Sequence, residues 1–295
     1  MEALRSHIQE ISDSLLDKVQ TKGKMEVIAD FAVPLPAIVT AEMLGTPTSD
    51  YFQLKQWTEV FAEILGNFQH NPGRASQVIK SLEEMTAYFR AAIAELKVRP
   101  REGVVHSLMT AEVNGDRLTE EEVIANCIIV MAGGQETTTN LIATGLLTLF
   151  HHPDQMARLK SDSSLLPSAV EELLRFEPPV LQTACLAPAD TDLGGKKISK
   201  QQAVIAVMAA ANRDPERFPD PNRLDLARQD NRHLAFGWAA HFCFGAALAR
   251  IEGQIAFETL LRRLPGLALD PGPLTWRNNQ GLRGLEALPV TFRPV

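Results

Sequence analysis

The sequence contains only three cysteines, Cys127, Cys185 and Cys243, and no two of them form a Cys-x-x-Cys pair. A disulfide framework needs more cysteines than this, and a thiolate zinc site needs them closely spaced. The sequence therefore predicts neither kind of site. Sparse, unpaired cysteines are typical of proteins kept in a reducing compartment, so we expect a cytoplasmic location.

The sequence also lacks long apolar runs and an excess of positive charge. No stretch reaches the roughly 18 apolar residues that a membrane-spanning helix needs, and the first ten residues do not resemble a secretory signal. We therefore expect no membrane span. The net charge is −7, from 29 basic and 36 acidic residues. Because phosphate contacts need surplus Lys and Arg, we expect no nucleic-acid partner.

Apolar residues recur every three or four positions through much of the chain, which predicts amphipathic helices. Thr119 and Glu122 form a capping-box pattern that fixes the start of one helix. If this helix continues to residue 150, its length is roughly 45 Å at about 1.5 Å per residue. The other predicted helices cover 2–20, 31–44, 51–68, 78–96, 167–176 and 245–264.

Short strands are expected where β-branched residues alternate between turn residues. The ranges are 183–186, 193–198, 203–208, 282–285 and 290–292. The sequence contains neither an internal repeat nor a low-complexity linker. We therefore expect a single domain over residues 1–295, mainly α with minor β.

The long predicted helix contains residues that disfavour helices. Gly133 and Gly134 each cost about 1 kcal/mol relative to Ala in a helix interior, and three threonines, 137–139, follow them. Glu136 is a charged group in an otherwise apolar stretch. Several residues that disfavour a helix, gathered at one place in it, indicate a functional site. A packing notch of small residues with a hydrogen-bonded Glu explains the pattern equally well.

A second motif is EELLR, which places Glu172 and Arg175 on one face of a short helix. An Arg fork can hold a carboxylate in a charge-assisted pair. Surface pairs at this spacing are common and contribute little, so the motif alone is a weak signal. Arg223, further along the chain, is a candidate third member of the cluster.

The third motif is the stretch HLAFGWAAHFCFGAALARIE, residues 233–252. Cys243 lies where a loop of small residues becomes the last long helix, and the unpaired N–H groups of a helix start favour a thiolate. A flat, wide ligand could approach the sulfur closely. Three alternatives remain: a small buried hydrophobe, a nucleophile paired with His241, and a metal site with His241 as second ligand.

Taken together and in this order, the segments GGQETT, EELLR, ANRDPERFPDPNRLD and FGWAAHFCFG resemble the cytochrome P450 family, the haem-thiolate monooxygenases, in its soluble bacterial form. The resemblance extends over residues 1–295. It implies a P450 fold with a long central helix and a haem-binding cysteine loop. It also implies heme b, iron protoporphyrin IX, as the cofactor.

The resemblance implies a role for each matching residue of the cysteine loop. Cys243 would be the axial thiolate on the haem iron, and such a ligand favours O–O cleavage. His241 would bond a haem propionate. Phe236 begins the loop pattern and would contact the cofactor.

The other two motifs receive roles in the same way. Glu136 and Thr137 would be the acid–alcohol pair that handles dioxygen and its protons, and Gly133 and Gly134 would leave room for dioxygen above the ring. The EELLR motif would supply a buried structural triad that supports the cysteine side. Its members would be Glu172, Arg175 and Arg223.

The chain departs from the family pattern in three ways. Relatives normally have about 100 further residues before the position of Met1, so the fold is expected to be N-terminally truncated, without its main sheet and first helices. Met1 then reflects a start codon assigned too late or a gene broken upstream. Cys185 stands where a propionate-binding Arg is usual, and Ala239 stands where a loop Gly is common.

The resemblance implies insertion of one atom of dioxygen into a small apolar substrate, by hydroxylation or epoxidation. Electrons would come from a ferredoxin or flavodoxin with its reductase. Arg228, Arg232 and Arg250 could dock that partner, or simply form a solvated charged face. The alternative is a non-catalytic truncated remnant with weak or no haem binding.

Overall fold

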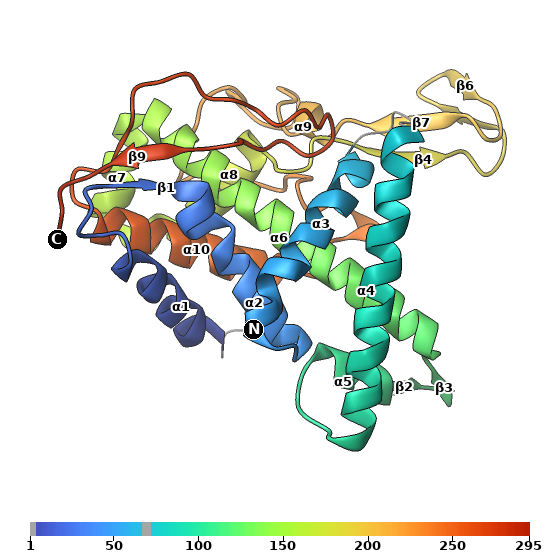
Figure 1. The fold of residues 1–295 in the computed structure, drawn as a ribbon. Helices are drawn as coiled ribbons and strands as arrows, with labels where there is room; N and C mark the ends of the chain where they lie inside the picture. Colours follow the sequence, from blue (N-terminus) through green and yellow to red (C-terminus); the bar gives the residue numbers. More distant parts are fainter. Residues whose placement is uncertain (1–3, 67–71) are drawn as a thin grey trace.

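The fold is arranged around one long helix. In the computed structural model, which describes residues 4–66 and 72–295, helix α6 spans Glu120–His151 and runs through the middle of the molecule (Figure 1). The hydroxyl of Thr119 accepts the N–H of Glu122, whose carboxylate accepts the N–H of Thr119. The predicted capping box is therefore confirmed. The 32 residues of α6 give a length of about 48 Å.

The remaining helices surround α6, and α2, α3, α4, α8 and α10 contact it. Their bounds are α1 Arg5–Asp17, α2 Pro34–Leu44, α3 Tyr51–Gly66, α4 Pro72–Val98, α5 Val104–Thr110, α7 Pro153–Ser161, α8 Leu166–Phe176, α9 Met208–Ala211 and α10 Ala246–Arg263. All the predicted helices are present, although the end of the stripe over 51–68 lies outside the described residues. The helix predicted from residue 31 is a π-helical turn, Ile28–Ala32, followed by α2. The short helix α5 was not predicted, because it buries a single side chain, Val105.

The strands form small antiparallel sheets. Strands β4, Thr183–Leu186, and β7, Ala203–Ala206, pair with each other, as do β2, Glu112–Val113, and β3, Asp116–Arg117. The strand segment predicted over 193–198, with Gly194 and Gly195 expected at a turn, is a hairpin in which β5, Thr191–Leu193, turns through these two glycines into β6, Lys196–Ile198. The strand predicted over 282–285 is wrong. Its residues form only isolated bridges, Val180 with Leu282 and Trp276 with Leu285.

Residues from opposite ends of the described chain share one sheet. Strand β9, Pro289–Thr291, lies between β1, Lys24–Glu26, and β8, Ala268–Leu269. The sheet continues past β1, because the N–H of Val27 donates to the carbonyl of Leu288. This pairing places α1 beside α10, which it contacts along much of its length.

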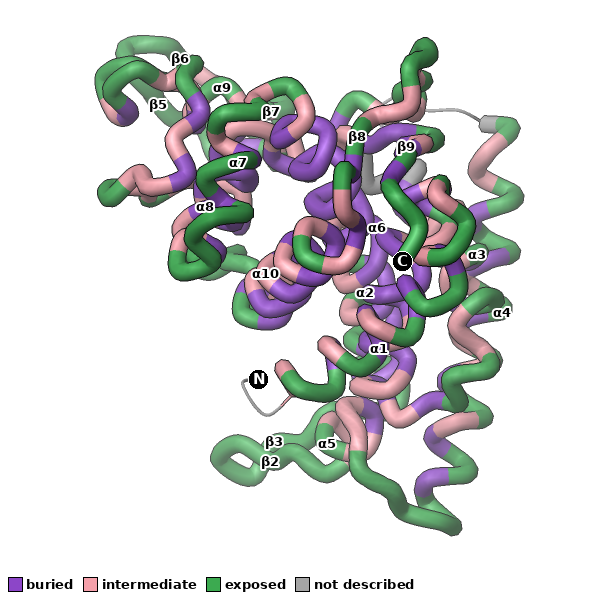
Figure 2. Tube along the Cα trace, turned by 90° about the vertical axis from the view of Figure 1, so that its left-hand side faces the viewer, coloured by how far each residue is buried: buried purple, intermediate pink, exposed green. Residues whose placement is uncertain are grey.

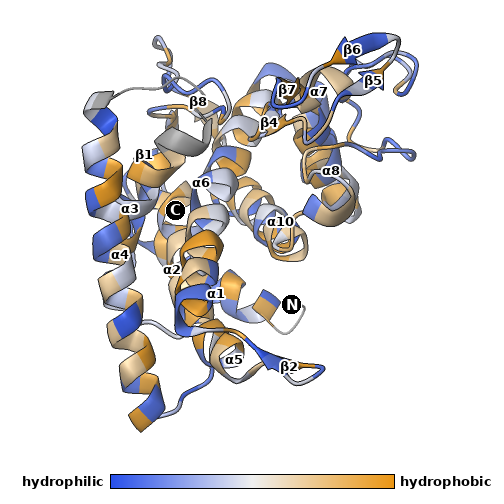
Figure 3. Cartoon of the chain, turned by 90° about the vertical axis from the view of Figure 1, so that its right-hand side faces the viewer, coloured by the Kyte–Doolittle hydropathy of each residue, from blue (hydrophilic) through white to orange (hydrophobic). Residues whose placement is uncertain are grey.

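Two apolar clusters meet α6 on either side of a polar stretch. The first half of α6, as far as Met131, packs with α3, α4 and α5. The second half, from Leu141 onwards, packs with α1, α8 and α10. Figure 2 shows the buried residues gathered along α2, α6 and α10, and Figure 3 shows α2 as mostly hydrophobic and β2 and β6 as hydrophilic. Residues 132–140, which contain the predicted functional motif, therefore lie between the two cores. Within the described ranges, no helix is both long enough and apolar enough to cross a bilayer.

Candidate functional site

Cys243 lies at a tight turn three residues before α10 begins at Ala246. Its N–H donates to the carbonyl of Phe236 at 2.8 Å, which closes the loop on itself. Gly237 has φ +73°, and a Cβ there would lie 3.1 Å from the carbonyl oxygen of His241. A side chain at Gly237 would therefore be both strained and crowded. The loop geometry depends on this glycine.

The thiol of Cys243 lies on an exposed aromatic surface. Cys243 and His241 are exposed, as are the side chains of Trp238, Phe242 and Phe244, at 72%, 51% and 69%. Large exposed apolar groups gathered in one place mark a binding surface. The interpretation as a small buried hydrophobe does not fit Cys243.

That interpretation fits Cys127 instead. Cys127 is completely buried in the cluster around the first half of α6, and burial raises the pKa of its thiol to about 12. Cys185, on β4, is exposed like Cys243 but belongs to neither α6 nor α10. The three cysteines therefore lie in three different environments.

A charged cluster supports the cysteine loop from below. The guanidinium of Arg250 on α10 lies 4.5 Å from the ring centroid of Phe236 and donates to both oxygens of Glu171, at 2.7 and 2.9 Å. His233 Nε2 lies 3.3 Å from Glu171. Burial alone would raise the pKa of Glu171, but hydrogen bonds from His233 and Arg250 outweigh it and lower the pKa to about 2. Arg250, which is held by its ion pair with Glu171, lies against the ring of Phe236 and fixes that ring in place.

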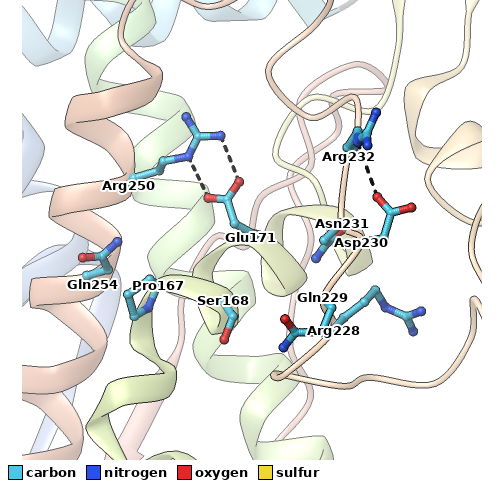
Figure 4. Close-up of a pocket in the computed structure, with 10 residues that line it drawn as sticks. All are labelled: Pro167, Ser168, Glu171, Arg228, Gln229, Asp230, Asn231, Arg232, Arg250 and Gln254. Atoms are coloured by element: carbon cyan, nitrogen blue, oxygen red, sulfur yellow. Dashed lines mark hydrogen bonds and ion pairs between the residues drawn. The ribbon is translucent and has the colours of Figure 1, made fainter.

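A surface pocket of about 670 Å³ opens beside this cluster, between α8, α10 and the loop over 228–232 (Figure 4). Figure 4 shows Arg250 turned toward Glu171 and Arg232 turned toward Asp230. Of the three arginines that were candidates for partner docking, Arg228 is nearly buried and Arg250 is held by Glu171. Arg232 is the most exposed of the three, with 82% of its side chain accessible, and it pairs with the exposed Asp230 at 3.5 Å.

The EELLR pair is a buried ion pair. Arg175 donates from Nε and Nη2 to the two oxygens of Glu172, both at 2.8 Å, and both side chains are completely buried. The third member is Arg228, whose Nε lies 3.1 Å from Glu172. The prediction of Arg223 is wrong. The chain turns there, so Arg223 is exposed and only its backbone carbonyl faces inward, accepting from Arg175.

The two glycines of α6 have different surroundings. A Cβ on Gly133 would meet nothing within 4 Å, so Gly133 faces open space. A Cβ on Gly134 would lie 2.8 Å from the hydroxyl of Thr40 on α2. Gly134 is therefore a packing notch between two helices, which was the alternative interpretation of this stretch. Thr137 donates to the carbonyl of Gly133 at 2.7 Å, a bond that bends helices.

Glu136 is buried and paired. Its carboxylate accepts from the guanidinium of Arg277, which lies in the segment between β8 and β9. The side-chain amide of Asn140, one turn further along α6, lies 3.4 Å from the same oxygen. The sequence analysis missed Arg277 because it lies 141 positions from Glu136 and belongs to no local pattern.

Comparison with known proteins identifies the family. The family model for cytochrome P450 matches residues 39–268. The chain belongs to the cytochrome P450 family. Among curated P450s it is 42% identical to the cytochrome P450 monooxygenase PikC of Streptomyces venezuelae, over 99% of this chain and 70% of that protein. It is 40% identical to the biotin biosynthesis cytochrome P450 of Bacillus subtilis, over 99% of this chain and 73% of that protein.

Solved P450 structures agree with the fold. P450BioI, in complex with an acyl carrier protein ligated to hexadec-9Z-enoic acid, superimposes with a TM-score of 0.94 at 40% identity, over 99% of this chain and 75% of that one. The myxobacterial CYP267B1, in complex with myristic acid, gives 0.93 at 42% identity, over 99% and 72%. The predicted fold class, mainly α with minor β, and the bacterial type of P450 are confirmed. The family is one of enzymes, and PikC is named a monooxygenase.

The P450 family implies a haem cofactor, and the residues present fit one. The exposed thiol of Cys243 supplies a soft ligand of the kind that P450 haem iron takes. Three exposed aromatic side chains around it give a large flat group an apolar surface. Gly133 and His241 both face open space or solvent, where a ligand can reach them.

Proposed function

We propose that this chain is a haem-dependent monooxygenase that inserts one atom of dioxygen into a small apolar substrate, by hydroxylation or epoxidation. The observation that carries the proposal is the exposed thiol of Cys243, fixed at the turn before α10 amid exposed aromatics, in a chain of the P450 family. When bound, heme b supplies the redox chemistry that activates dioxygen, and the cysteine ligand favours O–O cleavage.

The loop residues would bind the cofactor. The sulfur of Cys243 would hold the haem iron, and the backbone of Cys243 is fixed by its N–H bond to the carbonyl of Phe236. The ring of Phe236 supports the loop from the protein side, and the exposed His241 is available to a propionate. Cys185, exposed on β4, replaces a cationic propionate partner, so we expect weaker haem retention than in relatives that have an Arg there.

The residues of α6 would handle the protons of the reaction. Glu136 would hold and pass protons through its carboxylate, and the hydroxyl of Thr137 would orient the oxidant. Thr137 already donates to the carbonyl of Gly133, so its oxygen remains free to accept a second bond. Gly133 leaves open space beside the hydroxyl.

The proposed partners follow from the bacterial type. A ferredoxin or flavodoxin with its reductase would deliver the electrons, and Arg232, whose side chain is 82% exposed and pairs with Asp230, would be a docking cation beside the charged pocket. The apolar substrate is supported by two structural relatives, which carry fatty acyl ligands. The residues would form one domain over 1–295, because both apolar clusters share α6.

One observation favours the alternative of a non-catalytic remnant. The β4–β7 ribbon exposes Leu186 and Ile205, at 65% and 50%. Exposed apolar strands of this kind are prone to association. The ratio of haem to protein after purification separates the remnant from the enzyme.

The test is the absorption spectrum of the reduced, carbon-monoxide-treated protein. We expect the Soret band that is characteristic of thiolate ligation, and we expect Cys243→Ser to abolish it. Cys185→Ser, an exposed cysteine outside the loop, is the matched control and should keep the band. A band that survives in Cys243→Ser, or a parent protein without haem, contradicts the proposal.

A further inference from the structure

The segment that carries Arg277 folds back on itself. The N–H of Arg277 donates to the carbonyl of Gly284 at 3.0 Å, and the N–H of Glu286 donates to the carbonyl of Thr275 at 2.9 Å. We refer to residues 275–286 as the Arg277 hairpin. Two backbone hydrogen bonds therefore fix the point from which the side chain of Arg277 extends.

The guanidinium of Arg277 contacts two carboxylates on different helices. Nη1 bonds Glu136 on α6, and Nη2 lies 3.8 Å from Glu59 on α3. Glu136 is only 8% exposed, and a buried carboxylate without a counter-charge is costly. Arg277 supplies the positive charge that pairs with Glu136.

A second contact docks the hairpin at the same place. Gly284 lies so close to α6 that a Cβ there would be 2.3 Å from the side-chain oxygen of Asn140. Asn140 is the residue whose amide lies 3.4 Å from Glu136. The hairpin therefore contacts Glu136 directly through the guanidinium of Arg277, and it contacts the neighbouring Asn140 through the backbone at Gly284.

The hairpin is also attached to α3. The amide of Asn279 donates to the carbonyl of Ala62 at 3.2 Å. Glu59 has a further partner in Lys55, at 3.0 Å, so it does not depend on Arg277 for charge balance. If α3 moves relative to α6, Arg277 loses its weaker contact with Glu59 and is left to Glu136 alone.

We propose that Arg277 is a positioning residue for Glu136. Its guanidinium holds the carboxylate in one orientation, and its shared contact with Glu59 makes that orientation depend on where α3 lies. The proposal rests on the proposed function in one respect, namely that Glu136 is the carboxylate that passes protons.

The first test is a double-mutant cycle on the thermal unfolding midpoint, with Arg277→Gln, Glu136→Gln and the double variant. We expect each single change to lower the unfolding midpoint, because it separates the pair and leaves one charge without this partner. We expect the decrease in the double variant to be much smaller than the sum of the two single decreases. The matched control is Arg283→Gln. Arg283 lies in the same hairpin but pairs with Glu177 at 2.9 Å, so its change and Glu136→Gln should be additive. An additive cycle for Arg277 and Glu136 overturns the proposal.

The second test uses the haem-loaded protein and measures the fraction of electrons that ends in product rather than in peroxide. We expect Arg277→Gln to lower this fraction several-fold, Arg277→Lys to restore most of it, and Arg283→Gln to leave it unchanged. An unchanged fraction in Arg277→Gln contradicts the positioning role. If the parent protein shows no thiolate Soret band, the proposed function fails, while the cycle still decides whether Arg277 holds Glu136.

Discussion

At the scale of single residues, the buried ion pair of Glu172 and Arg175 shows how a charged group can be placed in a core. Arg175 also donates to the carbonyl of Asn212 at 2.8 Å, and Arg228 adds a further donor to Glu172. Because partners are supplied on all sides, the cost of burying both charges is offset. Removing one member of the pair leaves the other as a buried charge without a partner of opposite sign.

This arrangement predicts unequal effects for two nearby arginines. Arg228→Gln removes a donor from a buried carboxylate, so we expect a loss of about 1–3 kcal/mol in the free energy of unfolding. Arg223→Gln alters an exposed side chain whose backbone makes the contact, so we expect a change within about 0.5 kcal/mol. Urea denaturation of the two variants measures the difference. Equal losses would show that the Arg223 side chain belongs to the cluster after all.

At the scale of elements, neighbouring helices approach α6 so closely at some positions that only a small residue fits there. A Cβ on Gly145 would lie 2.5 Å from the ring of Phe257 on α10, whereas a Cβ on Gly133 would meet nothing within 4 Å. The same helix therefore contains glycines that the packing requires, Gly134 and Gly145, and one that it does not, Gly133. Gly133 lies in the polar stretch between the two cores.

This contrast predicts opposite effects of adding a methyl group to α6. Gly145→Ala overpacks the contact with α10, and we expect it to lower the free energy of unfolding by about 1–3 kcal/mol. Gly133→Ala should raise it by up to about 1 kcal/mol, because Ala is favoured over Gly within a helix. Thermal denaturation of both variants checks the signs. A destabilising Gly133→Ala would show that residue 133 is packed and does not face a site.

A second contact between α6 and α10 predicts that the free energy of unfolding depends on pH. Glu252 on α10 is fully buried, and burial raises its pKa from 4.5 to about 8, against a smaller lowering by its hydrogen bond with Thr138. A carboxyl with a raised pKa favours folding while it is protonated, so its contribution is lost as the pH rises from about 4.5 to about 8.

Glu252→Gln should remove this dependence. We expect the variant to gain stability relative to the parent over this pH range, by about 5 kcal/mol at most at the alkaline end. Unfolding free energies measured at a series of pH values in both proteins give the comparison. A constant difference from pH 4 to pH 9 would show that Glu252 does not titrate in this range.

The elements that the sequence predicted well are those set by local rules. The start of α6 follows from Thr119 and Glu122, and the end of α8 from the prolines after it. Non-local contacts could not be read in this way. The pairing of β1 with β9 and the contact of Glu136 with Arg277 join residues far apart in the chain. Whether Arg228 or Arg223 joins the buried ion pair depends on how the loop turns. The sequence places the two arginines five positions apart and does not show which of them turns inward.

At the scale of the whole molecule, the residues proposed to meet the cofactor lie on the surface, while the charged residues that support them or carry protons lie inside. Cys243, His241 and Gly133 are exposed, whereas Glu136, Glu172 and Arg175 are buried. The family relationship extends over the chain and spans 70% of several curated relatives. The central claim is therefore a local one, that the sulfur of Cys243 binds the haem iron.

Alkylation of the three cysteines tests this claim most directly, with the extent at each position read by mass spectrometry with and without bound hemin. Cys127 is buried and should stay unmodified in both samples, which makes it the internal control. We expect Cys243 to react in the haem-free protein and to be protected when hemin is bound. Equal alkylation of Cys243 in the two samples would contradict the account.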